Sequence, residues 1–355
     1  MFLFYFFFFI ALLQTATAAV NVTAAVNVTE EVNCLDECGL STALFVEPEE
    51  PSFRSFGSAA INVRSFPFSA IIYAEPRDCD FIFVCSAVII SNKYILTAEH
   101  CLEFGVMDLN QCGLEDINDD GINTVERLRP GDIKVFVGSS SIREAIKKDD
   151  FIKICTERDY RSDSAGLAEN ITFTHYIRPI CIANDYTFEL GEKAFYTGFG
   201  ATSEPKSGPP AIGDKIIPAD QLKELTVDLS TPRLCIKLHS RKDFICAGSP
   251  GRGLLYGDSG GPLFVYRNNR AFLIGIATFT TTISNATLTR NQMRKDLSPD
   301  VFTSVGHHCE WITDKSSVKC KSIATKLPPS CVQTAEEEKK PKTWFESVKG
   351  FLGFD

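Results

Sequence analysis

Between residues 69 and 279, short apolar segments alternate with glycine, proline, asparagine and aspartate. Segments of four to ten residues are typical of β-strands, and the turn-forming residues between them indicate hairpins and loops. Asn268-Asn269 separates the last two segments, and asparagine tolerates the left-handed backbone of a tight turn. The pattern predicts an all-β fold, built as barrels or as a sandwich. The expected strands are 69–73, 81–90, 134–138, 194–198, 222–229, 244–247, 263–266 and 271–279.

One of the turns carries a candidate nucleophile, Ser259. Residues 257–263 read Gly-Asp-Ser-Gly-Gly-Pro-Leu, so the serine follows an acid and lies between glycines. Glycine lets backbone N–H groups approach a developing negative charge, which an oxyanion hole requires. A polar, glycine-rich hairpin between two strands is the alternative explanation of the same residues.

A second segment, upstream, supplies the histidine that such a serine needs as a general base. It reads Leu-Thr-Ala-Glu-His-Cys over residues 96–101, which places His100 near its end. Together, the two segments resemble the active-site signatures of the chymotrypsin/trypsin family of serine endopeptidases, and the resemblance extends from about residue 55 to residue 312. It implies two six-stranded antiparallel β-barrels with the active site between them, closed by a short helix around residues 310–312.

The resemblance assigns catalytic roles to these residues. Ser259 would attack a peptide carbonyl, His100 would take its proton, and the N–H groups of Gly257 and Ser259 would hold the oxyanion. A carboxylate should hold His100 in the correct tautomer, and Asp163 is the candidate. The family places this acid at the head of an apolar strand. Here only residues 161–166 lie between the segment that matches the family before this strand and the segment that matches it afterwards, and they contain no apolar run. Either a trimmed loop still brings Asp163 to His100, or the acid is missing.

The resemblance also locates a substrate pocket. Gly253 stands where trypsin has the aspartate that selects Lys or Arg, and Asp300 stands on the opposite wall. We therefore expect Asp300 to make the pocket acidic, so that it accepts basic residues and large apolar ones; its alternative role is to cap a turn. Thr280 replaces a glycine and should narrow the entrance. The edge that would pair with the substrate backbone is Thr278, Phe279 and Thr280.

An activation cleavage is expected between Arg54 and Ser55. In the family, this cut frees an α-amino group that folds inward and pairs with the acid before the nucleophile, which is Asp258 here. A buried ion pair of this kind orders the oxyanion loop, so the chain would be made as a zymogen. Ser55 departs from the isoleucine that the family prefers, and an ordinary exposed arginine in a loop is the alternative.

The N-terminal region predicts export. Residues 1–13 are almost wholly apolar and Ala16-Thr17-Ala18 forms a small-residue cleavage site, which indicates a signal peptide over 1–18. Thirteen cysteines agree with an oxidising compartment, so we expect a secreted, extracellular protein. A glycosylated pro-region over 19–54, a trypsin-like peptidase domain over 55–315 and a C-terminal tail over 316–355 should follow. Glycosylation sequons begin at Asn21, Asn27, Asn170 and Asn285.

The resemblance also implies three disulfide bonds. It pairs Cys85 with Cys101, Cys235 with Cys246, and Cys181 with either Cys34 or Cys38. The last bond would tie the pro-region to the body of the protein after cleavage, giving a two-chain enzyme. For six further cysteines the sequence indicates no partner: Cys79, Cys112, Cys155, Cys309, Cys320 and Cys331.

We expect no cofactor. Asp116, Asn118 and Asp120 resemble the first half of a calcium loop, but Arg127 stands where the twelfth position requires a glutamate, so a solvated acidic loop is the favoured interpretation. A net charge of −9 argues against nucleic acid as a partner, and no membrane association is expected. The expected partners are protein or peptide substrates, an activating protease and protein inhibitors.

These features predict a secreted serine endopeptidase that is made as a zymogen and acts through an acyl-enzyme. The alternative is a catalytically impaired homologue that acts as a binding or regulatory protein. Two features favour the alternative: the shortness of the segment that would carry the catalytic Asp163, and Ser55. So does Glu99, which stands where the family has a small alanine and whose carboxylate must reach solvent or a cation. The intact serine motif and His100 favour the enzyme.

Overall fold

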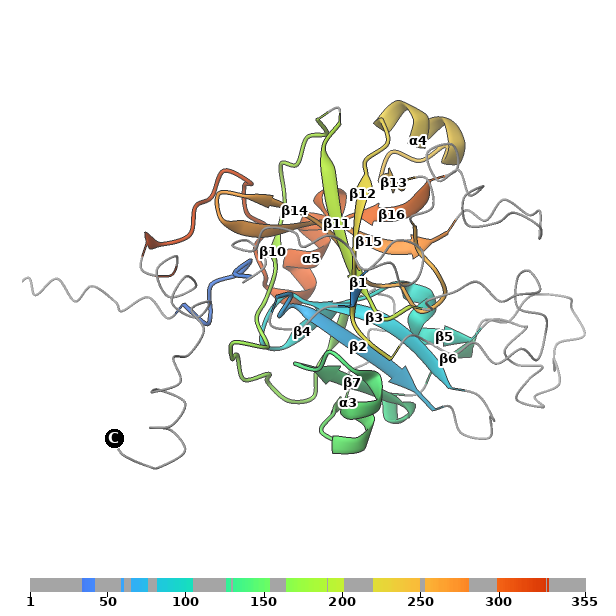
Figure 1. Cartoon of the computed structure of the whole chain (residues 1–355), viewed down its shortest axis with the longest axis vertical. Coiled ribbons are helices and arrows are strands. Elements are labelled where there is room, and N and C mark those ends of the chain that lie inside the picture. Colours follow the sequence, from blue (N-terminus) through green and yellow to red (C-terminus); the bar gives the residue numbers. More distant parts are fainter. Residues whose placement is uncertain are drawn as a thin grey trace, which may run out of the picture. The chain divides into compact units, whose positions relative to one another are not determined.

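The structure is a computed structural model (Figure 1). The chain divides into two units, residues 1–33 and residues 34–355, and every element below belongs to the second unit. The residues that the structure describes are 34–41, 59–60, 65–75, 82–104, 126–128, 130–153, 164–189, 191–200, 220–249, 253–280, 299–329 and 331.

The first sheet is antiparallel and has six strands, in the order β8-β7-β2-β3-β4-β9. Its centre is the hairpin of β2 and β3, in which Ile72 pairs with Cys85. Side chains on the inner face, such as Ile72, Ile89 and Val135, are completely buried and form a core of their own. The strands are β2 (Ser69–Ala74), β3 (Phe83–Ile89), β4 (Tyr94–Leu96), β7 (Ile133–Val137), β8 (Ile152–Lys153) and β9 (Ser164–Gly166).

The second sheet follows the order β1-β12-β11-β14-β15-β16-β13, with β10 paired to β15. The predicted hairpin at its centre is confirmed, because Asn268 and Asn269 join β14 to β15 with φ angles of 51° and 61°. The strands are β1 (Ala59–Ala60), β10 (Cys181–Ile182), β11 (Lys193–Gly198), β12 (Lys223–Asp228), β13 (Phe244–Ala247), β14 (Pro262–Arg267), β15 (Arg270–Phe279) and β16 (Asp300–Ser304).

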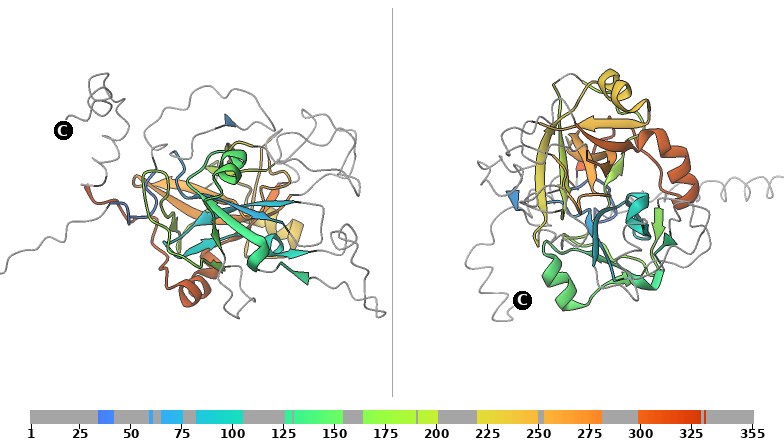
Figure 2. Two further views of the ribbon diagram at one scale, coloured as in Figure 1. Left: turned by 90° about the horizontal axis from the view of Figure 1, so that it is seen from below. Right: turned by 90° about the vertical axis from the view of Figure 1, so that its right-hand side faces the viewer.

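The expected two-barrel fold is confirmed: two curled antiparallel sheets pack against each other, one in each half of the molecule (Figure 2, right). The second sheet has eight strands rather than six, because the two-residue strands β1 and β10 join it. Aromatic rings fill the space between the halves. Phe68, the residue before β2, lies edge-on to Phe264 of β14, with ring centroids 5.1 Å apart.

Helices are few and short. α3 (Ile142–Lys148) and α4 (Pro232–His239) begin after Ser141 and Thr231, whose hydroxyls accept hydrogen bonds from backbone N–H groups of the first turn. α5 (Cys309–Ser316) is the expected C-terminal helix. Among the described residues, no helix has the length and apolar character needed to cross a bilayer. Shorter elements are η2 (Glu99–Leu102), β5 (Glu103–Phe104), β6 (Glu126–Arg127), η3 (Pro130–Asp132) and η5 (Gly306–His308).

Two segments outside the barrels pack on the second sheet. Residues 34–41 are joined to the body by Cys38–Cys181, which resolves the open choice of partner for Cys181, and to residue 331 by Cys34–Cys331. Fully buried Arg270 forms an ion pair of 2.7 Å with Glu37. Residues 34–41 of the predicted pro-region and residue 331 of the predicted tail are therefore linked to each other, and the former also to the barrel.

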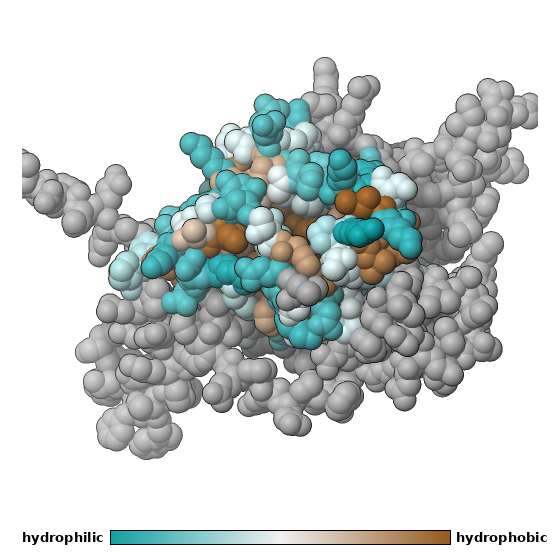
Figure 3. Space-filling model, turned by 90° about the horizontal axis from the view of Figure 1, so that it is seen from above, coloured by the Kyte–Doolittle hydropathy of each residue, from teal (hydrophilic) through white to brown (hydrophobic). Residues whose placement is uncertain are grey.

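A further disulfide joins Cys309 and Cys320, for which the sequence indicates no partner. Asn170 is exposed. Apolar side chains on the described surface seen from above form small, separate groups (Figure 3). The predicted features that lie outside the described residues are the signal peptide and Asn21, Asn27, Arg54, Ser55, Cys79, Cys112, Asp116, Asn118, Asp120, Cys155, Asp163 and Asn285.

Candidate active site

The histidine segment is fixed by the end of β4 and by a disulfide. After Leu96 the chain turns into η2, where Cys101 N–H donates to Ala98 O at 3.0 Å. Cys101 is bonded to Cys85 of β3, with their Cα atoms 6.0 Å apart. The disulfide that the resemblance implies is therefore formed, and it holds the turn that carries His100 against the first sheet.

The serine loop packs directly on this segment. Ser86 N–H donates to Ser259 O at 2.9 Å, and Cys101 Sγ lies 3.6 Å from the same oxygen. Gly260 has no room for a side chain, because a Cβ there would overlap Ser86 O and the hydroxyl of Thr97. The serine motif of the second half thus packs on β3 and on the histidine motif of the first half.

The loop that precedes the serine leaves two donors unpaired. Gly257 and Gly260 have φ angles of 89° and 83°, which glycine adopts without strain. Ser86 Oγ donates to Gly257 O at 3.0 Å and so fixes the orientation of that peptide. Within the described part of the chain, the N–H groups of Gly257 and Ser259 have no acceptor, and Ser259 Oγ has no hydrogen-bond partner.

Asp258 anchors the loop from inside. It is only 4% exposed. Its Oδ1 accepts from Gly200 N–H at 2.9 Å and its Oδ2 from Leu255 N–H at 2.8 Å. The Tyr196 hydroxyl donates to Asp258 O at 2.6 Å, and burial raises the pKa of this tyrosine far above its usual value. Arg54 and Ser55, the predicted cleavage site, lie outside the described residues.

His100 is exposed at the surface, yet surrounding protein withdraws water from its ring and so lowers its pKa below 6.5, while the carboxylate of exposed Glu99 acts in the opposite direction. The ring has no hydrogen bond or ion pair with any described residue. Asp163 lies outside the described residues, and β9 begins at the next residue, Ser164, which pairs with Leu96. The role of Asp163 remains a prediction.

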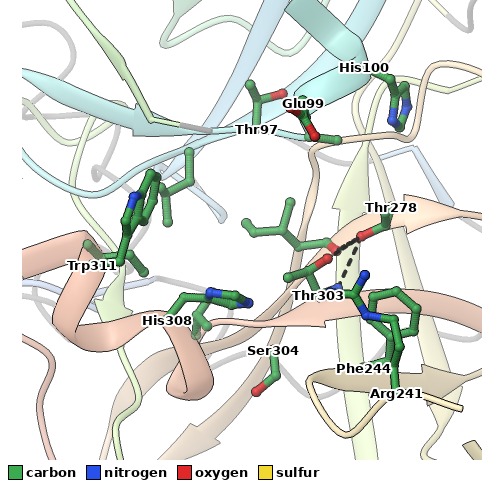
Figure 4. A pocket seen from close by; sticks show the side chains of 15 residues that line it. Thr97, Glu99, His100, Arg241, Phe244, Thr278, Thr303, Ser304, His308 and Trp311 are labelled. Atoms are coloured by element: carbon green, nitrogen blue, oxygen red, sulfur yellow. Dashed lines mark hydrogen bonds between the residues drawn. The ribbon is translucent and has the colours of Figure 1, made fainter. Parts of the chain in front are cut away.

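A pocket of about 410 Å³ opens beside His100 (Figure 4). Thr278 of β15 forms a 2.8 Å hydrogen bond with Thr303 of β16, on the wall that faces His100. Thr303, His308 and Trp311 could not be predicted from sequence, because no local motif marks residues that only the fold brings to the pocket. The pocket is lined by residues 96–100 from the first half and by Arg241, Phe244, Ile276, Thr278, Thr303, Ser304, Val305, His308, Trp311 and Ile312 from the second.

The predicted substrate pocket lies where β15 ends and β16 begins. Asp300 is completely buried, and its Oδ2 accepts from Leu254 N–H at 2.6 Å, one residue after Gly253. Its Oδ1 accepts from the Thr280 hydroxyl at 2.6 Å. The carboxylate therefore connects the start of β16 to Leu254 and to the residue that follows β15. Of the predicted edge, Phe279 is the most exposed, at 39%.

Cys235 and Cys246 form the other disulfide that the resemblance implies. It joins α4 to β13, the strand that precedes the serine loop. The family model named Trypsin matches residues 56–312, well over half of the chain. The chain belongs to the trypsin family.

Trypsin-family proteases from insects and from man are among its relatives. Phenoloxidase-activating factor 1 of Holotrichia diomphalia is 26% identical over 258 residues, which cover 70% of this chain and 66% of the relative. Serine protease grass of Drosophila melanogaster is 29% identical over 270 residues, 72% of this chain and 65% of the relative. Testisin of Homo sapiens is 26% identical over 247 residues, which cover 64% of this chain and 69% of the relative. The chain thus spans about two thirds of the length of these curated relatives.

Proposed function

We propose that this trypsin-family protein is a secreted serine endopeptidase, made as a zymogen, that hydrolyses peptide bonds through an acyl-enzyme. The main support is the packing of the Ser259 loop on the His100 segment, with two backbone N–H groups left unpaired beside the serine. A preorganised pair of donors is worth most when it needs no rearrangement during the reaction.

In the proposed mechanism, Ser259 Oγ attacks the carbonyl carbon while His100 takes the hydroxyl proton. The N–H groups of Gly257 and Ser259 donate to the oxyanion of the tetrahedral intermediate. His100 then passes the proton to the leaving amine, which leaves an acyl group on Ser259. A water molecule, deprotonated by His100, hydrolyses this ester. Asp163 is proposed to hold the imidazole in the required tautomer.

Substrate selection is assigned to Gly253, Asp300 and residues 278–280, and Asp300 is proposed to favour basic residues and large apolar ones. Because its carboxylate already bonds Leu254 N–H and the Thr280 hydroxyl, it would act by its charge rather than through a vacant oxygen. The names of two insect relatives describe an activating factor and an activating enzyme. Protein substrates, an activating protease that cuts after Arg54 and protein inhibitors are the proposed partners.

A non-catalytic homologue that acts as a binding or regulatory protein is the second candidate. Two observations favour it. The segment that carries Asp163 is short, and the exposed carboxylate of Glu99 directly precedes His100 in the chain. In such a protein, no carboxylate would hold His100 in the tautomer that catalysis requires.

Proteolysis itself tests the proposal. The chain from Ala19, cut after Arg54, is incubated with a protein mixture, and new N-termini are measured by mass spectrometry. We expect cleavage by the wild type, a loss of about 10⁶-fold in Ser259→Ala and of about 10⁴-fold in Asp163→Asn. Full activity of Asp163→Asn would assign the acid elsewhere. A folded, cut wild type that yields no new termini would favour the binding protein.

A further inference from the structure

Lys223 occupies a position where a charged side chain is uncommon. Burial alternates along β12, and Lys223, Leu225 and Val227 all face inward. Lys223 is only 7% exposed. Lysine is seldom buried without a partner, because its ammonium group loses hydration that the interior must replace.

The ammonium and the Asp258 carboxylate bind the two sides of one glycine. Lys223 Nζ donates to Gly200 O, while Gly200 N–H donates to Asp258 Oδ1 at 2.9 Å. Burial lowers the pKa of Lys223, and the charge of Asp258 opposes this by favouring the ammonium form. The lysine is therefore both an electrostatic partner of Asp258 and a support for the backbone that binds it.

Asp258 in turn fixes the oxyanion loop, residues 253–261. Its side chain accepts from Leu255 N–H and its carbonyl accepts from the Tyr196 hydroxyl, so the loop backbone at residues 255 and 258 depends on its buried position. A buried carboxylate is stable only where charge and hydrogen bonds replace its hydration. Without a cation nearby, the loop would gain by releasing Asp258 to solvent.

The strand next to Lys223 carries the segment that activation would free. Ala60 of β1 pairs with Lys223 itself, and Ser55 precedes Ala60 by five residues. A new amino group at Ser55 would thus compete with the Lys223 ammonium for the position near Asp258. A serine side chain also gains little from burial there, whereas Lys223 is held by its own strand.

We propose that Lys223 is the internal counter-charge of Asp258 and that it orders the oxyanion loop in the uncleaved chain. This inference rests on the proposed function, since it concerns the loop that would hold the oxyanion. Lys223 is a positioning residue that acts through Gly200 and Asp258. The uncleaved zymogen then already has part of the reactivity of Ser259, and cleavage after Arg54 raises it further.

The test uses the full chain with Arg54→Gln, which keeps it uncleaved, and compares it with Lys223→Met and Lys223→Arg in that background. Lys193→Met is the matched control, because Lys193 lies on the adjacent strand β11 but pairs with Asp228 at the exposed surface. Two quantities are measured: the rate at which a fluorophosphonate labels Ser259, and hydrogen–deuterium exchange of amides 253–261. Thermal melting identifies variants that do not fold.

In the uncleaved parent and in Lys193→Met, the rate at which a fluorophosphonate labels Ser259 should be within about tenfold of the rate in the cut wild type. In both, amides 253–261 should be protected from hydrogen–deuterium exchange. Lys223→Met should label about 10²-fold more slowly, as when an oxyanion donor is lost, and its loop should exchange faster; Lys223→Arg should keep most of both properties. In a cut Lys223→Met chain the amino group of Ser55 should restore labelling.

Two results would overturn the inference: a protected loop in uncleaved Lys223→Met, or an unprotected loop in the uncleaved parent that becomes ordered only on cutting. Absence of labelling in every form, including the cut wild type, would refute the proposed catalysis instead. The exchange data would still decide the role of Lys223, because they do not depend on an active serine. If Lys223→Met does not fold, Lys223→Arg and the parent still provide the comparison.

Discussion

At the scale of single residues, His100 is exposed, yet the enclosure by neighbouring protein removes part of the hydration of its imidazole. The enclosure lowers its pKa and Glu99 partly restores it. Only a neutral imidazole can take the serine proton, so the reaction slows as the pH falls through this pKa. In the proposed mechanism, Glu99 therefore affects the rate through the pKa of His100.

Glu99→Gln should extend activity to lower pH. Removing the carboxylate disfavours the imidazolium, which lowers the pKa of His100 and keeps the base neutral in more acidic solution. The measurement is the pH dependence of fluorophosphonate labelling, whose acid midpoint should fall. Because Glu99 is exposed, about 1 M salt should move the wild type toward the variant. A midpoint that rises in Glu99→Gln would contradict the assigned direction.

Gly260→Ala should destabilise the protein more than Gly191→Ala. Both glycines have positive φ, of 83° and 82°, but a Cβ at Gly191 meets nothing within 4 Å whereas one at Gly260 overlaps Ser86 O. The backbone strain common to both costs about 1–2 kcal/mol, and crowding should add about 1–3 kcal/mol at Gly260. Urea unfolding of the two variants, made in a Ser259→Ala background, gives the difference. Equal losses would mean that the serine loop does not need its close contact with β3.

At the scale of elements, the ends of β15 and β16 define the predicted substrate pocket. The Thr280 hydroxyl binds Asp300 across the space between them, so these two strand ends are tied together where the sequence predicts the pocket entrance. The polar contact and the Thr280 side chain should both restrict large residues.

Thr280→Gly should widen this entrance. We expect kcat/KM to rise about tenfold or more for peptides with arginine or phenylalanine before the cleaved bond, since a small change in pocket volume is worth about that much. Thr280→Ser, which keeps the hydroxyl for Asp300, serves as the control and should remain near the wild type. Unchanged selectivity in Thr280→Gly would remove Thr280 from the pocket wall.

Strands with alternating or continuous apolar residues and a marked turn could be predicted from sequence, and the Asn268-Asn269 hairpin is the clearest case. Two helices of seven and eight residues, α3 and α4, were missed because segments this short carry little periodicity. The order of the strands required the family resemblance. β1 and β10 were also missed, since two residues have no pattern of their own.

At the scale of the whole molecule, two disulfides connect the N-terminal segment to distant parts of the chain. Cys34–Cys331 closes a separation of 297 residues and Cys38–Cys181 one of 143. No spacing rule assigns such pairs, so Cys331 had no predicted partner. In the same way His100 and Ser259 could be named from motifs, whereas Thr303 and Lys223 gain their roles only from folding.

The segment N-terminal to Arg54 should therefore stay attached after cleavage by either bond alone. A site-specific protease sequence placed over residues 51–54 allows a defined cut, which is analysed on denaturing, non-reducing gels. We expect Cys34→Ser and Cys38→Ser to retain the N-terminal fragment and only the double variant to release it. Release from either single variant would show that the other bond does not form.

The central claim is that Ser259 is an activated nucleophile served by His100. Intact-mass measurement after treatment with a fluorophosphonate tests it most directly, on cut and uncut wild type beside Ser259→Ala and His100→Ala. The account predicts one adduct, located on Ser259, which is absent in Ser259→Ala and forms about 10⁶-fold more slowly in His100→Ala. A folded wild type that forms no adduct, or forms it equally fast without His100, would contradict the account.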